Sequence, residues 1–344
     1  MRITNNMLVM NLMNNLNTNL SRMDKTQQNL SSGKKFQLPS DDPIGVSKSL
    51  KYHTDLSRIA QYKRNLNDSI SWLQVTEDSL TQVGEIMKRT KELTVQALNG
   101  TNSPSDKQKI SEEIGQLKEQ LIKVSNATYA GRSIFTGYKT DTDLLDKDGY
   151  YKLTNYKNGS IGAGVTDMSE LSNDEVSIYN IGVSDQIKVN TVGIRLFGKY
   201  DGSSLDTPSY TDDVKGYKID KTNNISEKDA TTDKSYLIAL FDDIKATMDA
   251  DDHDGLDKDL GRLDAINENV LSLRAEIGAK CNRLEMTQSR MDDEELIFTK
   301  LMSDNEDIDM AETIMNSKMQ ESVYNASLAV GTKIIQPTLV DFLR

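Results

Sequence analysis

LDKDLGRLDAINENVLSLRAEIGAKCNRLEMTQSRMDDEELIFTKLM, residues 256–302, carries an apolar side chain at every seventh position. These positions are Leu256, Leu263, Val270, Ile277, Leu284, Met291 and Phe298. A second stripe beside it is mixed, because Asn267, Arg274, Gln288 and Glu295 interrupt Leu260, Ile266, Leu273, Cys281 and Met302. A repeat of seven is typical of a helix that packs along a partner. As one helix, this stretch would be about 70 Å long.

Two more helices are predicted in the N-terminal part of the chain. Steps of seven from Ile59 give Leu66, Leu73, Leu80, Met87 and finally Thr94. This stripe matches the first in length, as an antiparallel pair requires. A further helix follows, with apolar residues three and four apart at Ile110, Ile114, Leu117, Leu121 and Val124. Its start is marked by Ser103 as N-cap, Pro104 at the first helical position and Asp106 three residues after the cap.

The two ends of the chain are also amphipathic. Near the N-terminus, apolar residues recur every three or four positions at Ile3, Met7, Met10, Met13, Leu16, Leu20, Met23 and Leu30. Near the C-terminus, Ser303 with Glu306 forms a capping-box pattern, which predicts a new helix and a hinge at Ser303. That helix would run through Ile308, Ala311, Met315, Ala326 and Leu328 and stop before Pro337. Since terminal helices have no core of their own, we expect these stripes to pair with each other, with other subunits, or with both.

The middle of the chain is different, since residues 135–235 are rich in Gly and Tyr. Short runs at 176–179, 187–192 and 194–197 read as strands. The predicted fold is therefore mainly α with an inserted β domain, an elongated rod of long antiparallel helices plus paired terminal coiled-coil helices. We predict three parts: terminal helices at 1–40 with 303–344, a helical bundle at 41–137 with 236–302, and a variable β-rich domain at 138–235.

Composition excludes several functions. The 344 residues include 41 Lys and Arg against 53 Asp and Glu, giving a formal net charge of −12. Nucleic acids and anionic membranes require a cationic surface, so neither is expected as a partner. The hydrophobic share of 36% is low for two well-filled cores and favours long helices. We also expect neither a cleaved secretory signal nor a transmembrane helix.

Few residues suggest a reaction or a cofactor. The chain has two His and one Cys, so no disulfide can form within it. Acidic loops at 249–255 and 146–149 lack the carboxylates that an EF-hand needs at its first and twelfth positions, and we interpret them as solvated loops. Cys281 and Trp72 are interpreted as packing residues, and His53 as a surface or capping residue. We predict no catalytic, cofactor or metal site.

Four further sequence stretches are LSSGKKFQLPSDDPIG at 30–45, NATYAGRSIFTG at 126–137, DIDMAE at 307–312 and QPTLVDFL at 336–343. Together they resemble the flagellin superfamily. A flagellin usually has an Ala pair where this chain has Pro43 and Ile44. The form PSDDP at 39–43 is instead similar to the hook-associated members at the hook–filament junction. The resemblance covers residues 1–138 and 236–344 and is weak between them.

This resemblance implies a rod with paired terminal helices inside and a β domain outside. It also implies a structural adaptor of the bacterial flagellum, exported without a cleaved signal peptide. Its expected partners are another hook-associated protein on the hook side, flagellin on the filament side, further copies in a ring, and an export chaperone. Export through a narrow channel requires an unfolded chain, and the terminal helices would then fold as neighbouring subunits bury them.

We expect the apolar residues of the terminal stripes to make the subunit contacts. These are Met7, Met10, Leu16, Leu20, Met23, Leu30, Ile308, Met315 and Leu328. The closest alternative is flagellin itself, which shares the architecture but polymerises without limit. A more distant one is a glycan hydrolase that uses carboxylates in the middle of the chain, among Asp167, Glu170, Asp174 and Glu175.

Overall fold

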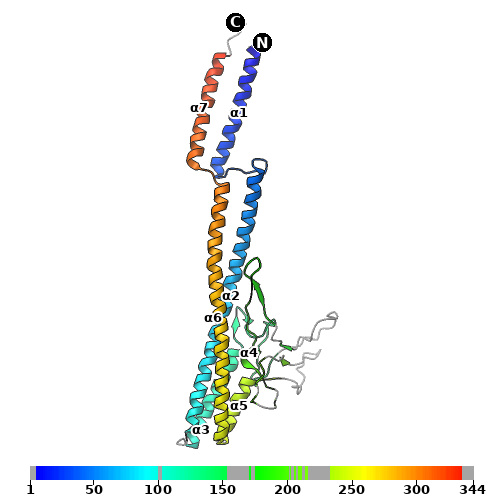
Figure 1. The fold of residues 1–344 in the computed structure, drawn as a ribbon, viewed down its shortest axis with the longest axis vertical. Coiled ribbons are helices and arrows are strands. Elements are labelled where there is room, and N and C mark those ends of the chain that lie inside the picture. Colours follow the sequence, from blue (N-terminus) through cyan, green and yellow to red (C-terminus); the bar gives the residue numbers. More distant parts are fainter. Residues whose placement is uncertain are drawn as a thin grey trace, which may run out of the picture. The chain divides into compact units, whose positions relative to one another are not determined.

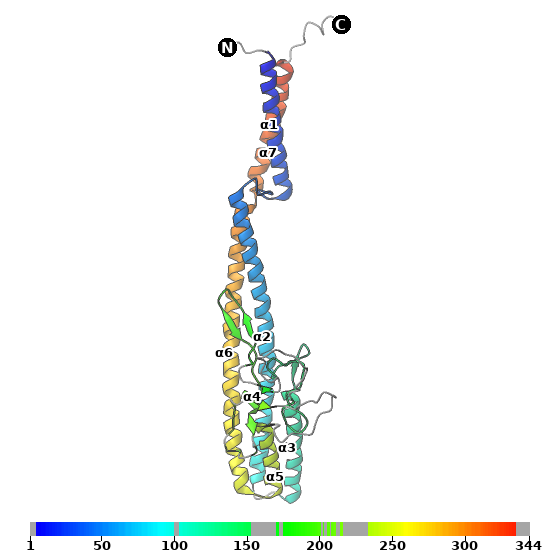
Figure 2. The ribbon, with the colours of Figure 1, turned by 90° about the vertical axis from the view of Figure 1, so that its right-hand side faces the viewer.

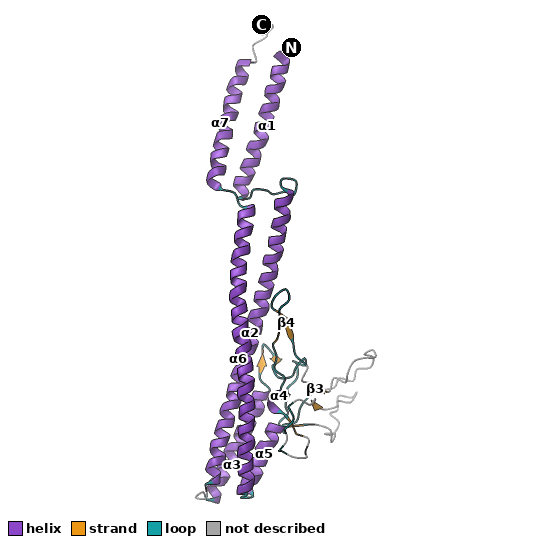
Figure 3. Ribbon diagram, in the orientation of Figure 1, coloured by secondary structure: helices purple, strands orange, loops and turns teal. Residues whose placement is uncertain are grey.

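The computed structural model describes residues 5–99, 103–152, 170–171, 175–200, 202, 205–206, 208–210, 214–215 and 233–334. Helices dominate these residues (Figure 3). The long helices are α1 (Asn5–Ser32), α2 (Pro43–Leu98), α3 (Pro104–Ser125), α5 (Tyr236–Asp249), α6 (His253–Glu306) and α7 (Met310–Ile334). The predicted mainly helical fold with small strands is confirmed.

The chain forms two compact units. The first contains residues 1–60 and 291–344, and the second contains residues 61–290. Helices α2 and α6 contribute residues to both units. The three-part division from the sequence remains a prediction.

The second unit is a bundle of α2, α3, α5 and α6, in which α3 packs on α5 (Figures 1 and 2). Its core confirms the predicted stripe on α2, since Leu66, Leu73, Leu80, Met87 and Thr94 are all buried. On α6 the same holds for Leu256, Leu263, Val270, Ile277 and Leu284. The periodicity therefore identified the buried faces of both helices.

Helix α3 begins as predicted from its capping residues. Ser103 has an extended backbone, and its Oγ accepts a hydrogen bond from the Asp106 N–H. Pro104 occupies the first helical position, where the absent N–H would have no helical partner. This local sequence is sufficient to fix where the helix starts.

The middle of the chain folds into short antiparallel ladders beside the bundle. They are β1 (Thr128–Tyr129) with β2 (Arg132–Ser133), β3 (Glu170–Leu171) with β7 (Val214–Lys215), β4 (Ile178–Asn180) with β5 (Gln186–Lys188), and β6 (Lys199–Tyr200) with β8 (Lys234–Ser235). The strand predicted at 194–197 is wrong. This segment is a one-turn helix, α4 (Ile194–Phe197), because the Phe197 N–H donates to the Gly193 carbonyl and Ile194, Leu196 and Phe197 are all buried.

The first unit contains α1, α7, the beginning of α2 and the end of α6. Helices α1 and α7 lie side by side (Figures 1 and 2). The helix start predicted at Ser303 is wrong, because α6 continues to Glu306 and Ser303 Oγ donates to Asp307 Oδ2. Asp309 caps α7 instead, since its Oδ1 accepts hydrogen bonds from the Ala311 and Glu312 N–H groups. The break between the helices therefore lies at 307–309.

Candidate assembly surface

The seam between α1 and α7 uses one face of α1 with heptad spacing. Its half-buried positions are Val9, Leu12, Leu16, Asn19, Met23, Thr26 and Leu30. These residues follow a repeat of three and four along α1, as in helices that pair along their length. Five of the seven are apolar, so α1 contributes most of the hydrophobic surface to this seam.

The α7 side of the same seam is small and polar. Its half-buried or buried positions are Thr313, Asn316, Ser317, Gln320, Tyr324, Ser327 and Gly331. Thr26 Oγ1 donates to Gln320 Oε1 at 3.0 Å, which joins the two helices directly. At Gly331 the helices are close, because a Cβ placed there would lie 3.0 Å from Leu12 Cδ2. Helix α7 therefore uses its polar face for α1.

This pairing leaves the apolar face of α7 exposed. Met315 is 66% exposed and Leu328 is 43% exposed, and Ile314, Met319, Val323 and Val330 are exposed too. On α1, Met7, Met10, Met13 and Leu20 are exposed. Most of the exposed large apolar side chains among the described residues lie in the first unit. Exposed apolar patches in soluble proteins are typical of sites that contact proteins, membranes or ligands.

The structure separates the predicted assembly residues into two groups. Met7, Met10, Leu20, Met315 and Leu328 are exposed. Leu16, Met23 and Leu30 are half-buried on the α1 face that meets α7, and Ile308 is half-buried in the connection between α6 and α7. The first group is free for a partner, whereas the second stabilises the pair within one chain. Subunit contact remains a prediction for all of them.

The connection from α1 to α2 pairs with the connection from α6 to α7. The Lys35 N–H donates to the Glu306 carbonyl at 2.6 Å, and the Ile308 N–H donates to the Gly33 carbonyl at 3.1 Å. These bonds form an antiparallel bridge between Lys34 and Asp307. Gly33 adopts φ +72°, a left-handed conformation that glycine accepts without strain. The segment that follows the C-terminal end of α1 is thus joined to the segment that precedes the N-terminal end of α7.

Glu306 is the centre of this junction, and its side chain is buried. Its Oε2 lies 2.8 Å from Lys34 Nζ, its Oε1 lies 3.1 Å from His53 Nε2, and it also accepts a hydrogen bond from the Ser49 hydroxyl. Burial raises the pKa of Glu306, but the hydrogen bonds from Lys34 and Ser49 outweigh burial and hold this pKa below its usual value. Sequence reasoning missed this role because the capping-box pattern assigned Glu306 to a helix start.

The stretch 41–45 caps helix α2. Asp42 Oδ1 accepts hydrogen bonds from the Ile44 and Gly45 N–H groups, at 3.1 and 3.0 Å. A Cβ at Gly45 would lie 2.5 Å from Asp42 Oδ2 and 2.7 Å from Phe36 Cε1. Asp41 pairs with Lys25 of α1 at 2.9 Å, and this contact lowers the pKa of Asp41. The sequence DDPIG at 41–45 therefore serves the connection between α1 and α2.

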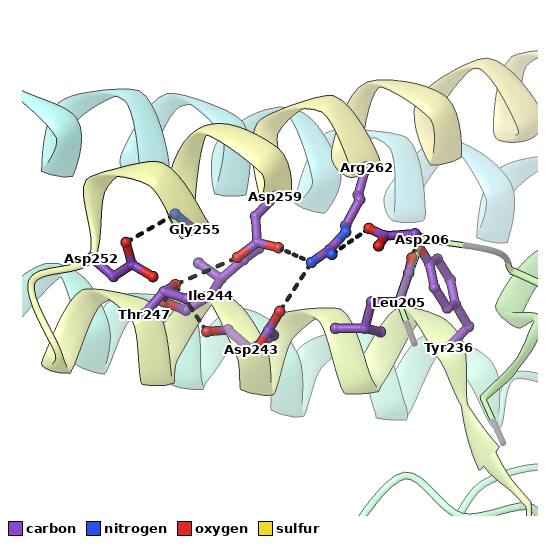
Figure 4. A network of polar contacts seen from close by, with 10 residues as sticks. All are labelled: Leu205, Asp206, Tyr236, Asp243, Ile244, Thr247, Asp252, Gly255, Asp259 and Arg262. Carbon is purple, nitrogen blue, oxygen red and sulfur yellow. Dashed lines mark hydrogen bonds and ion pairs between the residues drawn. The ribbon is translucent and has the colours of Figure 1, made fainter. Parts of the chain in front are cut away.

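A second polar cluster, which includes the buried Asp259, lies in the second unit (Figure 4). The Arg262 guanidinium donates to Asp259 of α6, Asp243 of α5 and Asp206 of the middle segment, at 2.7, 3.0 and 2.6 Å. Asp259 is fully buried at a seam position where the sequence analysis expected Leu260. Burial, with repulsion from Asp243, raises the pKa of Asp259 to about 6. This cluster ties three segments together.

The other residues considered in the sequence analysis make capping, packing or ion-pair contacts. In the acidic loop 249–255, Asp252 Oδ1 accepts from the Gly255 N–H at the start of α6. Trp72 packs edge-on against Tyr129, with ring centroids 5.9 Å apart. Cys281 is half-buried, which raises the pKa of its thiol. His53 is largely exposed but contacts Glu306.

The glycan hydrolase alternative named four carboxylates, and the structure describes two of them, Glu170 and Glu175. Asp167 and Asp174 lie outside the described residues. Glu175 accepts a hydrogen bond from the Tyr138 N–H at 3.1 Å. In the ranges that the structure describes, no three His, Cys, Asp or Glu side chains are grouped to hold a metal ion. No helix in those same ranges has the length and hydropathy of a membrane span.

Comparisons with known sequences find flagellar proteins as relatives of this chain. The family described as bacterial flagellin N-terminal helical region matches residues 3–140. Flagellar hook-associated protein 3 of Escherichia coli (strain K12) is 27% identical over 343 residues, which cover 96% of each chain. A flagellin of Salmonella montevideo is 30% identical over 241 residues, or 69% of this chain and 45% of the flagellin. The chain thus spans about half the length of the curated flagellins it matches.

Solved structures share the fold. A putative flagellar hook-associated protein from Vibrio parahaemolyticus superposes with a TM-score of 0.57 at 20% identity, covering 78% of this chain and all of that one. A flagellar junction protein from Legionella pneumophila gives a TM-score of 0.51 at 15% identity, covering 75% and 99% of the two chains. At sequence identities of 15% and 20%, this structural similarity supports the fold alone.

Proposed function

We propose that this chain, which resembles flagellar hook-associated protein 3 over almost its whole length, is a structural adaptor of the bacterial flagellum. It joins the hook and its associated protein to the flagellin filament. Its role is structural, because it must bind two different protein polymers, one at each of its two faces. It carries out no reaction.

The observation that carries this proposal is the extent of the match. The flagellar hook-associated protein 3 of E. coli aligns over 96% of both chains, whereas the Salmonella flagellin aligns over only 45% of its own length. A flagellin remains the second candidate because α1, α2 and the PSDDP stretch lie in a region matched by the flagellin family. The proline at position 43, in place of the usual alanine of flagellins, supports the junction protein.

The first unit supplies a physical mechanism for assembly. The α1–α7 seam buries the polar face of α7 and leaves Met315 and Leu328 in water, so the isolated pair gains little from folding. Helices without a buried apolar face are marginal in water. Neighbouring subunits would cover these side chains and so compensate the conformational entropy lost on ordering. Assembly and folding of the ends are therefore coupled.

This mechanism implies the partners and the location. The chain leaves the cell unfolded and without a cleaved signal peptide, and it assembles outside the cell at the hook–filament junction. It contacts another hook-associated protein on the hook side, flagellin on the filament side and further copies of itself in a ring. Before export, a chaperone would cover the exposed stripe of α7 at Met315, Met319, Val323 and Leu328. Of the three parts predicted from the sequence, the terminal helices would lie on the inside of the assembly, the helical bundle next to them, and the β-rich domain on the outside.

Seeded polymerisation distinguishes the junction protein from a flagellin. Purified chain is added to short filament seeds of the same bacterium, and filament length is followed by electron microscopy. A junction protein should not lengthen the seeds, since its contact with further copies closes in a ring. Long filaments made of this chain alone would contradict the proposal and identify a flagellin.

A further inference from the structure

Exposed methionines are concentrated on α1 and α7. Each is at least 50% exposed, and we call the six together the terminal methionines: Met7, Met10 and Met13 of α1, and Met310, Met315 and Met319 of α7. Among the residues that the structure describes, the one other exposed methionine is Met286 of α6, in the second unit. Met87, Met248 and Met291 are buried. The thioethers open to water therefore gather on the two helices of the candidate assembly surface.

The seam between α1 and α7 depends little on methionine. Four of its five apolar positions on α1 are Val or Leu, and the fifth is the half-buried Met23. The seam positions of α7 given above include no methionine. A chemical change at the terminal methionines would therefore leave the α1–α7 pair in place and alter the surface that it presents to a partner.

An exposed thioether reacts with two-electron oxidants such as hydrogen peroxide to give a sulfoxide. A sulfur lone pair takes one oxygen atom from the peroxide, so that an S–O bond forms as the O–O bond breaks. The sulfur is oxidised by two electrons, and the peroxide is reduced to one water molecule. The product is polar where methionine is apolar. Burial of such a polar group without a hydrogen-bond partner is unfavourable.

We propose that the terminal methionines are oxidation sites of the unassembled chain, and that their sulfoxides prevent its incorporation. A neighbouring subunit would have to bury a polar S–O group in place of an apolar side chain. Once assembled, the same methionines are covered and protected from the oxidant. Oxidation therefore removes damaged chains before assembly and spares junctions that are already built. This inference rests on the proposed function.

Oxidation rates test the sites. The Cys281→Ser chain is treated with hydrogen peroxide, and the sulfoxide at each methionine is followed by targeted mass spectrometry. The terminal methionines should oxidise about as fast as Met286 and severalfold faster than the buried Met87 and Met248. In isolated flagella that contain this chain, they should oxidise severalfold more slowly than in the free chain. Rates as low as that of Met87 in the free chain, or rates in flagella equal to those of the free chain, would overturn the proposal.

Substitution by leucine tests the consequence for assembly. Leucine at all six terminal positions keeps the side chains apolar and similar in volume but cannot be oxidised. A strain that lacks the native gene carries either this variant or the parent and grows with sublethal hydrogen peroxide. Filaments per cell should fall severalfold with the parent and much less with the leucine variant, although flagellin is the same in both strains. Met286→Leu is the matched control and should behave like the parent.

Substitution by glutamine provides a second test without peroxide. Glutamine at the six positions is polar and similar in length, so this variant should form severalfold fewer filaments than the parent, whereas Met286→Gln should match it. Normal filaments with the glutamine variant would overturn the proposal. So would equal losses with the parent and the leucine variant, or no loss with the parent at a peroxide dose that oxidises its terminal methionines. Circular dichroism of each purified variant checks that the helices remain folded.

The outcomes separate this inference from the proposed function. The parent chain must first restore filaments to the strain without the gene. If it does and neither peroxide nor the glutamine variant lowers the filament count, the oxidation sites are wrong and the junction role stands. If that strain forms normal filaments without the chain, the proposed function itself fails.

Discussion

Lys34 Nζ lies 2.8 Å from Glu306 Oε2, although 272 residues separate them in the chain. This ion pair joins the segment after α1 to the end of α6. The same lysine also reaches Asp307 Oδ1 at 2.8 Å, and the two carboxylates raise the pKa of Lys34. The contact holds together the segments from which α1 and α7 extend, so it bears directly on how the two ends of the chain meet.

Glu306→Ala should loosen the pairing of α1 with α7. The substitution leaves Ser49 and Lys34 without their buried acceptor, at a local cost of about 1–3 kcal/mol. Pairing is measured by disulfide formation between Thr26→Cys and Gln320→Cys in a Cys281→Ser background, because the native side chains lie 3.0 Å apart. The rate should fall in Glu306→Ala and less in Glu306→Gln, which keeps an acceptor for Ser49. Asp304→Ala, two residues earlier and exposed, is the control and should leave the rate unchanged.

Leu328→Asp should block incorporation into the flagellum and leave the bundle of the second unit folded. Leu328 is 43% exposed in the single chain and would become buried at a subunit contact, where an unpaired charge is costly. Asn325→Asp adds the same charge to the same helix at an exposed polar position and is the matched control. The measurements are swimming, filament counts and thermal unfolding. Normal filaments with Leu328→Asp would show that this stripe is not an assembly surface.

Asp259→Asn should stabilise the second unit at pH 7.5, and the gain should disappear toward pH 4. The folded pKa of Asp259 is about 6, above the usual value near 3.9 for an unfolded chain. Folding therefore favours the protonated acid, so the contribution of Asp259 to the free energy of unfolding rises as the pH falls from about 7 to 4. Asparagine does not titrate, so the difference should be at most about 3 kcal/mol at neutral pH. Denaturant unfolding at several pH values measures it.

The control for this prediction is Asp257→Asn, an exposed aspartate of the same helix. It should shift the free energy of unfolding by little at any pH between 4 and 7.5. A gain from Asp259→Asn that persisted unchanged at pH 4 would mean that the buried charge is not its origin.

Replacing either of two glycines in the long helices by alanine should change helix stability, in opposite directions at the two positions. Gly45→Ala should destabilise the start of α2 by about 1 kcal/mol or more, because the new Cβ would meet Asp42 Oδ2 and disturb the cap. Gly278→Ala in α6 meets no atom within 4 Å and should stabilise its helix by about 0.5–1 kcal/mol. Amide hydrogen exchange of each helix reports the two effects. Equal gains at both positions would contradict the close contact at Gly45.

The long helices could be predicted from the sequence because their information is periodic. An apolar residue at every seventh position is repeated over many turns, so one polar interruption does not hide it. The N-cap role of Ser103 could also be predicted, since a cap depends only on residues that are close to it in the chain. The strand predicted at 194–197 failed because alternating Ile194, Arg195, Leu196 and Phe197 suits a buried helical turn as well as a strand.

The buried polar residues could not be predicted, because their partners are distant in sequence. Asp259 occupies a core position only because Arg262 and Thr247 of the folded unit donate hydrogen bonds to it. Glu306 is explained by Lys34 and Ser49, more than 250 residues away. Likewise, the apolar residues of α1 were identified, but which of them face α7 depends on the polar face of that helix.

The measurement that tests the central claim most directly is deletion of the gene in a motile bacterium, with electron microscopy of the cells and assay of flagellin in the medium. We predict hooks without filaments and flagellin monomers released into the medium, both reversed by the intact gene. Filaments on normal hooks in the deletion strain would contradict the junction role.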